Sequence, residues 1–309
     1  MDELVAISLI GEVLLPGALA VRLLRCPGAR GAHLAACAAY GGMLWTVGVW
    51  QLFPRSLLVL WGLLQAGAAI LSRRRPEQPP GVGRASLRPH PATLSSLLIA
   101  VVSTAVFLFA RFAPAPPEAE TVDLDSPLRG GTFRVVHGGF SILINPHLKT
   151  LSSEALAPHR GQAYALDIVR VDPLGRRARG LRPGDPRDYF IFWLPVFAPC
   201  GGTVIASRSG MPDRSPPRMD PDPPEGNFVR LDCGGFEVVV AHLAQSSPSV
   251  APGDRVAAGA FLGRVGNSGM SLEPHLHLHA ERREEGGSRP VAVRIGGRRL
   301  VRNDLFSPQ

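Results

Sequence analysis

Nearly all of the long apolar runs in this 309-residue chain lie within its first 113 residues. Four of these runs come close to the roughly 20 residues that an α-helix needs to cross the hydrocarbon core of a bilayer. They are Leu4–Leu24, Ala32–Leu52, Leu57–Leu71 and Thr93–Phe112. The first run is a poor signal peptide, because the chain begins Met-Asp-Glu where a signal peptide carries positive charge. We therefore expect an all-α transmembrane region of four helices over residues 1–113.

The arginines that flank these runs predict how they cross the membrane. Eight arginines belong to the loops after the first and third runs, whereas the opposite side carries only Arg55 and Arg111. Cytoplasmic loops are the ones enriched in Lys and Arg. The N-terminus and everything after the fourth run are therefore expected outside the cytoplasm, in the periplasm or at the cell exterior.

The formal net charge of +8 does not indicate a nucleic-acid partner. Up to Phe112 the chain has ten Arg and four acidic residues, whereas from Ala113 onward it has 23 basic and 21 acidic residues. Most of the excess positive charge thus flanks the apolar runs, where it reports membrane topology. We expect no nucleic-acid binding by the nearly neutral remainder.

The remainder of the chain has the pattern of a β domain behind a linker. Residues 114–129 are rich in Pro and acidic residues, which predicts an extended tether. Over 130–309, short segments of β-branched and aromatic residues alternate with turn residues, which is typical of strands. The expected strands include the segments at 140–145 and 189–197. Since no stretch shows helical periodicity over three turns, we predict an all-β sandwich or barrel-like domain.

Three histidines stand at alternate positions in the segment EPHLHLHAE, as His275, His277 and His279. The flanking leucines are apolar, so the segment has the period of a half-buried strand, and the three imidazoles share one face. Two adjacent imidazoles can be two metal ligands, or one ligand beside an acid–base group.

Several short segments, taken in order, resemble the lysostaphin-like zinc metallopeptidases. They are YALD at 164–167, APCGGTV at 198–204, AHL at 241–243, the glycine-rich run at 250–269 and PHLH at 274–277. The resemblance extends over roughly Gly138 to Glu281 and includes none of the four apolar runs. It implies the duplicated-hybrid-motif fold, a β fold of barrel-sandwich type, and cleavage of peptide cross-links in bacterial peptidoglycan.

The resemblance also implies a Zn²⁺ site and roles for individual residues. Asp167 and His277 match two metal ligands, and His242 and His275 match the two catalytic histidines. The third ligand should be a histidine upstream of Asp167, and either His147, in Asn-Pro-His, or His159 can supply it. Two imidazoles and one carboxylate leave zinc an open position, as in hydrolytic sites.

Other residues are assigned from their local sequence. His137, next to Gly-Gly, is expected to be a turn residue, and His279 is either an outer partner of the metal site or exposed. In an oxidising compartment Cys200 and Cys233 either pair or remain thiols. The proline-rich insertion at 210–227 could cover the site.

Two functions of other classes remain open alongside a membrane-anchored zinc endopeptidase. One is a degenerate, non-catalytic relative that binds partners or activates cell-wall hydrolases, for which loss of metal ligands would be the signature. The other is a membrane sensor or transporter subunit. Against the latter, the apolar runs have almost no ionisable residue at mid-membrane depth apart from Glu12.

Overall fold

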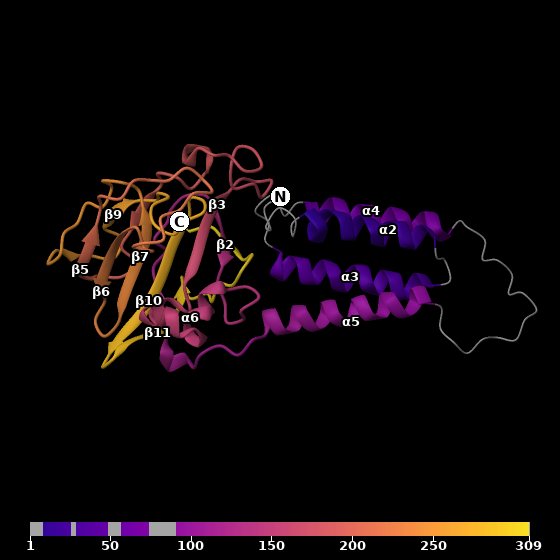
Figure 1. Cartoon of the computed structure of the whole chain (residues 1–309), viewed down its shortest axis with the longest axis horizontal. Coiled ribbons are helices and arrows are strands. Elements are labelled where there is room, and N and C mark those ends of the chain that lie inside the picture. The colour runs from indigo at the N-terminus through magenta and orange to yellow at the C-terminus, as the bar shows by residue number, and fades with distance from the viewer. Residues whose placement is uncertain (1–8, 26–28, 49–56, 74–90, 309) are drawn as a thin grey trace, which may run out of the picture. The chain divides into compact units, whose positions relative to one another are not determined.

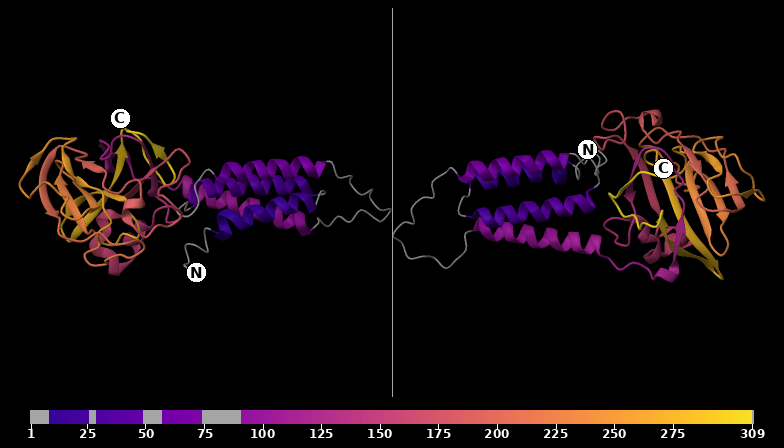
Figure 2. Two further views of the ribbon diagram at one scale, coloured as in Figure 1. Left: turned by 90° about the horizontal axis from the view of Figure 1, so that it is seen from above. Right: turned by 180° about the vertical axis from the view of Figure 1, so that it is seen from behind.

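The computed structural model describes residues 9–25, 29–48, 57–73 and 91–308 (Figures 1 and 2). The chain divides into two compact units, Met1–Phe112 and Ala113–Gln309. Each unit has its own hydrophobic core, and we describe the two separately.

The N-terminal unit is helical. Its elements are η1 (Leu9–Leu14), α2 (Leu15–Arg25), α3 (Arg30–Val47), α4 (Leu57–Arg73) and α5 (Pro91–Arg111). Helix α3 packs along α5, and α2 packs along α4 (Figure 1). The ring of His33 on α3 is fully buried and contacts the Ser96 hydroxyl on α5. The expected helices therefore form, each with a face buried against its neighbours.

The sequence predicts four membrane spans, but only one of the described helices is long and apolar enough to cross a membrane. Helix α5 has 21 residues and is long and apolar enough to cross a bilayer. Helix α4 is apolar but has 17 residues, α2 has 11, and α3 begins with Arg30 and includes His33. The first predicted run is π-helical over η1 and α-helical over α2. Parts of the first two predicted spans lie outside the described residues.

The C-terminal unit is rich in β-structure. Ten strands form one sheet in the order β12-β2-β3-β10-β7-β6-β5-β8, and β11 joins it by pairing with β10 and β1. The strands are β1 (Thr121–Leu124), β2 (Thr132–His137), β3 (Leu166–Val171), β5 (Gly202–Arg208), β6 (Asn227–Asp232), β7 (Glu237–Leu243), β8 (Arg255–Val256), β10 (Leu276–Glu284), β11 (Gly287–Ile295) and β12 (Leu305–Phe306). A separate pair consists of β4 (Pro195–Phe197) and β9 (Phe261–Arg264). The β-rich architecture expected from the turn-separated strand pattern is thus present.

One short helical turn precedes β1, and four more lie between β2 and β4. They are η3 (Glu118–Glu120), η4 (Pro146–Leu148), α6 (Lys149–Ser152), η5 (Glu154–Gln162) and η6 (Pro186–Asp188). Residues 140–145, expected to be a strand, form turns instead, and within 189–197 only β4 is a strand. Residues 121–124, expected to belong to the linker, form β1 and pair in parallel with β11. Their side chains are typical of a strand, but the Pro-rich sequence before them led to their assignment to the linker.

The alternation in β10 positions the site. Leu276, Leu278 and Ala280 are buried in the main hydrophobic core of this unit. Because successive side chains of a strand point to opposite faces, His277 and His279 lie on the other face of the sheet. The apolar residues of β10 therefore hold the two histidines in fixed positions.

Cys200 and Cys233 form a disulfide that closes a 33-residue loop, with their Cα atoms 6.0 Å apart. Both half-cystines pack against the main core. The alternative of free thiols, left open by the sequence, is therefore not realised. The bridge joins the turn that follows β4 to the end of β6, and so connects the two ends of the β5–β6 hairpin.

Replacing both Cys200 and Cys233 with serine should lower the free energy of unfolding of this unit by about 3 to 4 kcal/mol, because the unfolded chain regains the freedom of a loop of this length. Pulse proteolysis of the full-length chain in urea would measure the change. Cys37→Ser, which removes a free, buried cysteine in the other unit, is the matched control. Equal stability of the double variant and the wild type would contradict the prediction.

Candidate metal centre and active site

The site is built on three adjacent strands. Asp167 lies near the start of β3, directly opposite His137 at the end of β2 and His277 on β10. Directly paired residues on neighbouring antiparallel strands point to the same face, with Cβ atoms about 4.5–5.5 Å apart. The strand register therefore places one imidazole on each side of the Asp167 carboxylate.

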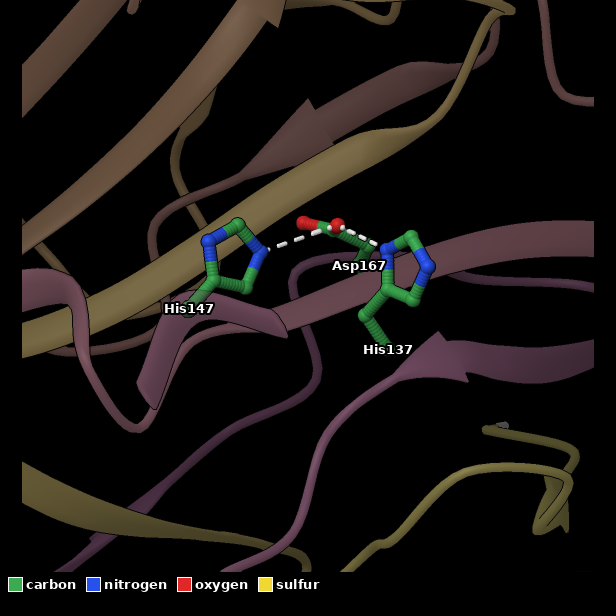
Figure 3. A group of neighbouring side chains, drawn as sticks. All are labelled: His137, His147 and Asp167. Atoms are coloured by element: carbon green, nitrogen blue, oxygen red, sulfur yellow. Dashed lines mark hydrogen bonds and ion pairs between the residues drawn. The ribbon is translucent and has the colours of Figure 1, made fainter. Parts of the chain in front are cut away.

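Three imidazole nitrogens contact this carboxylate. Nδ1 of His137 and Nε2 of His147 lie 2.8 Å and 3.0 Å from Oδ2 of Asp167 (Figure 3). Nδ1 of His277 lies 2.9 Å from the other oxygen, Oδ1. The structure thus brings together His147, Asp167 and His277, the residues predicted to be ligands. His137 joins them and is not the turn residue that the sequence suggested.

His147 reaches the site from a loop that Asn145 holds. Asn145 is the N-cap of η4, with its side chain accepting a hydrogen bond from the His147 backbone N–H and a proline at the first position. This is the arrangement that favours helix initiation. The buried amide also donates to the carbonyl oxygens of Gly139, Ala163 and Ala165, at 3.0, 3.2 and 3.4 Å. Asn145 therefore joins the segments that carry all three of His137, His147 and Asp167.

His159, the alternative ligand, lies elsewhere. It belongs to η5, and its Nδ1 is 3.8 Å from a carboxylate oxygen of Glu225. Of the two upstream histidines, the structure brings His147 to the Asp167 carboxylate.

The chemistry of these groups fits a bound cation. A carboxylate only accepts hydrogen bonds, and Asp167 is 4% exposed. Burial raises the pKa of the Asp167 carboxyl, but the facing histidines, His147 first, outweigh this effect and the pKa lies well below its usual range. One ligand atom from each of His137, His147 and Asp167 lies within 4.8 Å of the other two. A divalent ion bound by imidazole nitrogen and carboxylate oxygen, as zinc commonly is, would satisfy them.

His242 and His275 lie beside this centre with defined tautomers. The Nδ1–H of His242 donates to the Ser268 carbonyl at 2.9 Å, and the Nδ1–H of His275 donates to the Glu273 carbonyl at 2.8 Å. A carbonyl cannot donate, so in each neutral ring Nε2 keeps its lone pair. The two rings lie 4.7 Å apart between centroids, and Nε2 of His275 is 3.6 Å from Asp167. Two imidazole bases therefore lie at the candidate metal centre.

The position of His242 depends on an unusual backbone conformation. It is the penultimate residue of β7 and has a φ of 59°, a left-handed conformation that is uncommon for residues other than glycine. Its N–H donates to the carbonyl of Glu225, and its carbonyl accepts from Gly266. Burial, helped by the charges of the neighbouring histidines, lowers the pKa of the His242 ring well below its usual value. The ring is therefore neutral near pH 7, as a general base must be.

A second layer of polar side chains supports His277. Its Nε2 hydrogen-bonds with Nδ1 of the buried His279 at 3.0 Å. The other nitrogen of His279 lies 4.0 Å from Glu281, which is paired with Arg230. His279 is thus an outer partner of the predicted ligand and is not exposed. Such partners fix the tautomer and orientation of a metal-binding imidazole.

Part of the insertion at 210–227 lies beside His242. The carbonyl of Glu225 accepts from the His242 backbone, and Gly226 packs against Ser268, where a Cβ would come within 2.6 Å of the serine. Asp213 accepts from the backbone N–H groups of Asn267 and Gln245. The insertion therefore supports the loop that binds Nδ1 of His242, a contact that the sequence did not indicate.

Two residues of the site were missed or misassigned from sequence. Asn145 has a detectable signal, because an asparagine before Pro-His has the pattern of a helix cap. His137 has none, because strict alternation along β2 would place it on the core face with Phe133 and Val135.

Comparison with known proteins identifies the domain type. Residues 194–290 match the family model described as Peptidase family M23, so this part of the chain is an M23 peptidase domain. The matched residues include His242, His275 and His277 and begin after Asp167. A comparison with curated proteins found no match.

Solved structures that resemble the chain include M23 peptidases. A putative peptidase M23 from Pseudomonas aeruginosa is 21% identical, with 58% of this chain and 53% of that chain covered and a TM-score of 0.29. The catalytic domain of lysostaphin from Staphylococcus simulans is 24% identical, with 32% and 68% covered and a TM-score of 0.24. A chain in a complex of SpoIIIAH and SpoIIQ is 15% identical, with 54% of this chain and 96% of that chain covered and a TM-score of 0.31. The chain spans about half the length of the Pseudomonas structure. All three TM-scores are below 0.5.

Asn145→Ala should weaken zinc binding by about 10–100-fold, because it removes the support of His147 and Asp167. It should also lower the free energy of unfolding by about 1–3 kcal/mol, since buried carbonyls lose their donor. Chelator competition on the full-length chain would measure the affinity.

Asn227→Ala is the matched control for Asn145→Ala. Asn227 is equally buried, and its amide donates to the carbonyl groups of Met211 and Leu243. Its loss should reduce stability by a similar amount and leave zinc affinity unchanged. If Asn145→Ala bound zinc as tightly as the wild type, the supporting role would be wrong.

Proposed function

We propose that this chain is a zinc metalloendopeptidase that cleaves peptide cross-links of bacterial peptidoglycan. The observation that carries the proposal is the meeting of imidazole nitrogens from His147 and His277 at the buried carboxylate of Asp167. The M23 match at residues 194–290 supports the same conclusion. The imidazoles of His242 and His275, beside this group, supply the acid–base chemistry that peptide hydrolysis requires.

In this proposal His147, Asp167 and His277 hold the zinc. When bound, zinc supplies a Lewis acid that activates water and polarises the scissile carbonyl. The lone pair on Nε2 of His242 accepts the proton of the attacking water, and the protonated ring then delivers it to the leaving amine. His275, whose Nε2 is 3.6 Å from Asp167, would contribute a hydrogen bond to the developing oxyanion after Nε2 takes up a proton from solvent, and the Glu273 carbonyl holds its ring in place.

A membrane location is the second part of the proposal. Helix α5 is apolar over 21 residues and ends at Arg111, two residues before the C-terminal unit begins. It would hold this unit at the membrane surface, outside the cytoplasm, where peptidoglycan lies. The disulfide of Cys200 and Cys233 agrees with an oxidising compartment.

A non-catalytic module that binds or activates cell-wall hydrolases is the second candidate function. The observation that favours it is the additional imidazole of His137 at Asp167. A zinc ion held by four protein side chains has the coordination of a structural site, with no position left for substrate. Intact His242 and His275 favour the enzyme, since a purely structural site has no use for them.

Purified full-length chain should contain about one zinc per molecule, and His147→Ala or His277→Ala should each remove it. His159→Ala should leave it in place, because that ring lies against Glu225. Elemental analysis after gel filtration would give the stoichiometry. Absence of zinc from the wild type, or its loss from the His159 variant alone, would contradict the proposed ligand set.

His242→Ala and His275→Ala should each retain zinc and lower the rate of peptidoglycan cleavage by about 10²–10⁴-fold, the usual contribution of a positioned acid–base group. Release of new amino groups from purified peptidoglycan would measure the rate, with His159→Ala as the control. A zinc-loaded wild type that binds peptidoglycan without releasing amino groups would favour the binding module.

A further inference from the structure

His137 reaches the metal centre because of an irregularity in β2. The pairing of β2 with β3 shifts between Val135, which pairs with Ile168, and His137, which pairs with Asp167. In a regular strand, His137 would share the core face with Val135. The extra residue of a β-bulge re-aims the following side chain, and here it places His137 on the face of Asp167.

The surrounding structure holds this bulge in place. The guanidinium of the buried Arg302 donates to the carbonyl of Val136 at 2.7 Å, and its backbone N–H donates to the carbonyl of Gly138. A Cβ on Gly138 would lie 2.7 Å from a methyl group of Leu166, so a larger residue after His137 would have to displace core side chains. The position of the His137 backbone is therefore determined by its neighbours.

A ring nitrogen of His137 approaches Asp167 in the same way as a ring nitrogen of His147, a predicted ligand. Nδ1 of His137 and Nε2 of His147 approach the same oxygen of Asp167, at 2.8 Å and 3.0 Å. Ligand atoms around a tetrahedral zinc lie about 3.3 Å apart, given Zn–N distances near 2.0–2.1 Å. The two nitrogens are therefore close to the spacing from Asp167 Oδ2 that a shared ion requires, and the three atoms lie within 4.8 Å of one another.

We propose that His137 is a fourth protein ligand of the metal and closes its open coordination position in most molecules. This inference rests on the proposed zinc site and adds a resting, latent form to it. Hydrolysis then requires His137 to leave. Its side chain is 26% exposed, more than that of His147 or His277, so it is the member of the group with the most room to move.

A hydrogen bond from His137 to Asp167 would explain the same distance without coordination, and the two roles can be separated. Loss of either a ligand or an outer partner weakens metal binding, so affinity alone does not distinguish them. Access of a small anion to the metal does. A ligand that occupies its position in nine molecules out of ten lowers the apparent affinity of a competing anion about tenfold.

The experiment uses the full-length chain loaded with Co²⁺ and titrated with azide, an anion that binds open coordination positions and changes the visible absorption of cobalt. The variants are His137→Ala and His137→Gln, with His159→Ala as the control. Glutamine keeps a hydrogen bond to Asp167 but is a poor metal ligand. Both His137 variants should bind azide at least about tenfold more tightly than the wild type and the control.

Two outcomes would overturn the inference, in distinguishable ways. If cobalt in the wild type binds azide as tightly as in His137→Ala, or if His137→Gln behaves as the wild type, His137 is a hydrogen-bonding partner of Asp167. The proposed peptidase would then stand. If the wild type binds no cobalt, the proposed metal site itself fails. Should His137→Ala not fold, the wild-type titration and the glutamine variant still decide.

Discussion

The Asp167 carboxylate is the group on which the candidate site depends. It is almost fully buried on β3, between β2 and β10, where an ionised carboxylate is costly unless it is paired. The chain compensates with imidazole nitrogens from three segments that are distant in sequence. Because β3 lies between β2 and β10, His137 and His277 can both contact the Asp167 side chain. The site therefore forms only if these three strands pair in this order.

Regular structure positions only part of this site, and local exceptions position the rest. His277 needs nothing beyond the alternation of β10. His147 needs the Asn145 cap, whose amide also joins two neighbouring segments. His242 needs a left-handed backbone at the end of β7, and His137 needs a bulge. Strained or irregular backbone is frequent at functional sites, because it directs side chains where regular strands cannot.

This division explains how far the sequence could predict the structure. Period-two alternation identified β10 and the shared face of His277 and His279, and it identified β2, β3 and β5 to β7 closely. It misassigned 140–145, because the apolar residues there favour a strand while the buried Asn145 stabilises a turn. It also misassigned His137, since alternation assumes a register that the bulge changes. Apolar content overestimated the membrane spans among the described helices, because α4 has only 17 residues and α3 begins with Arg30 and includes His33.

The hydrogen bonds of the histidine rings show why some of these rings are held in place while His137 can move. The Nδ1–H groups of His242 and His275 donate to fixed backbone carbonyls, those of Ser268 and Glu273, and Nε2 of His277 hydrogen-bonds with Nδ1 of His279. Turning any of these rings would leave a buried polar group unsatisfied, which costs about 1–3 kcal/mol. His137 lies at the end of an outer strand of this group and is a quarter exposed, so water can satisfy its ring when it turns away. The same fold that fixes the catalytic histidines therefore leaves one imidazole able to move, and access to the metal can be controlled by that single side chain.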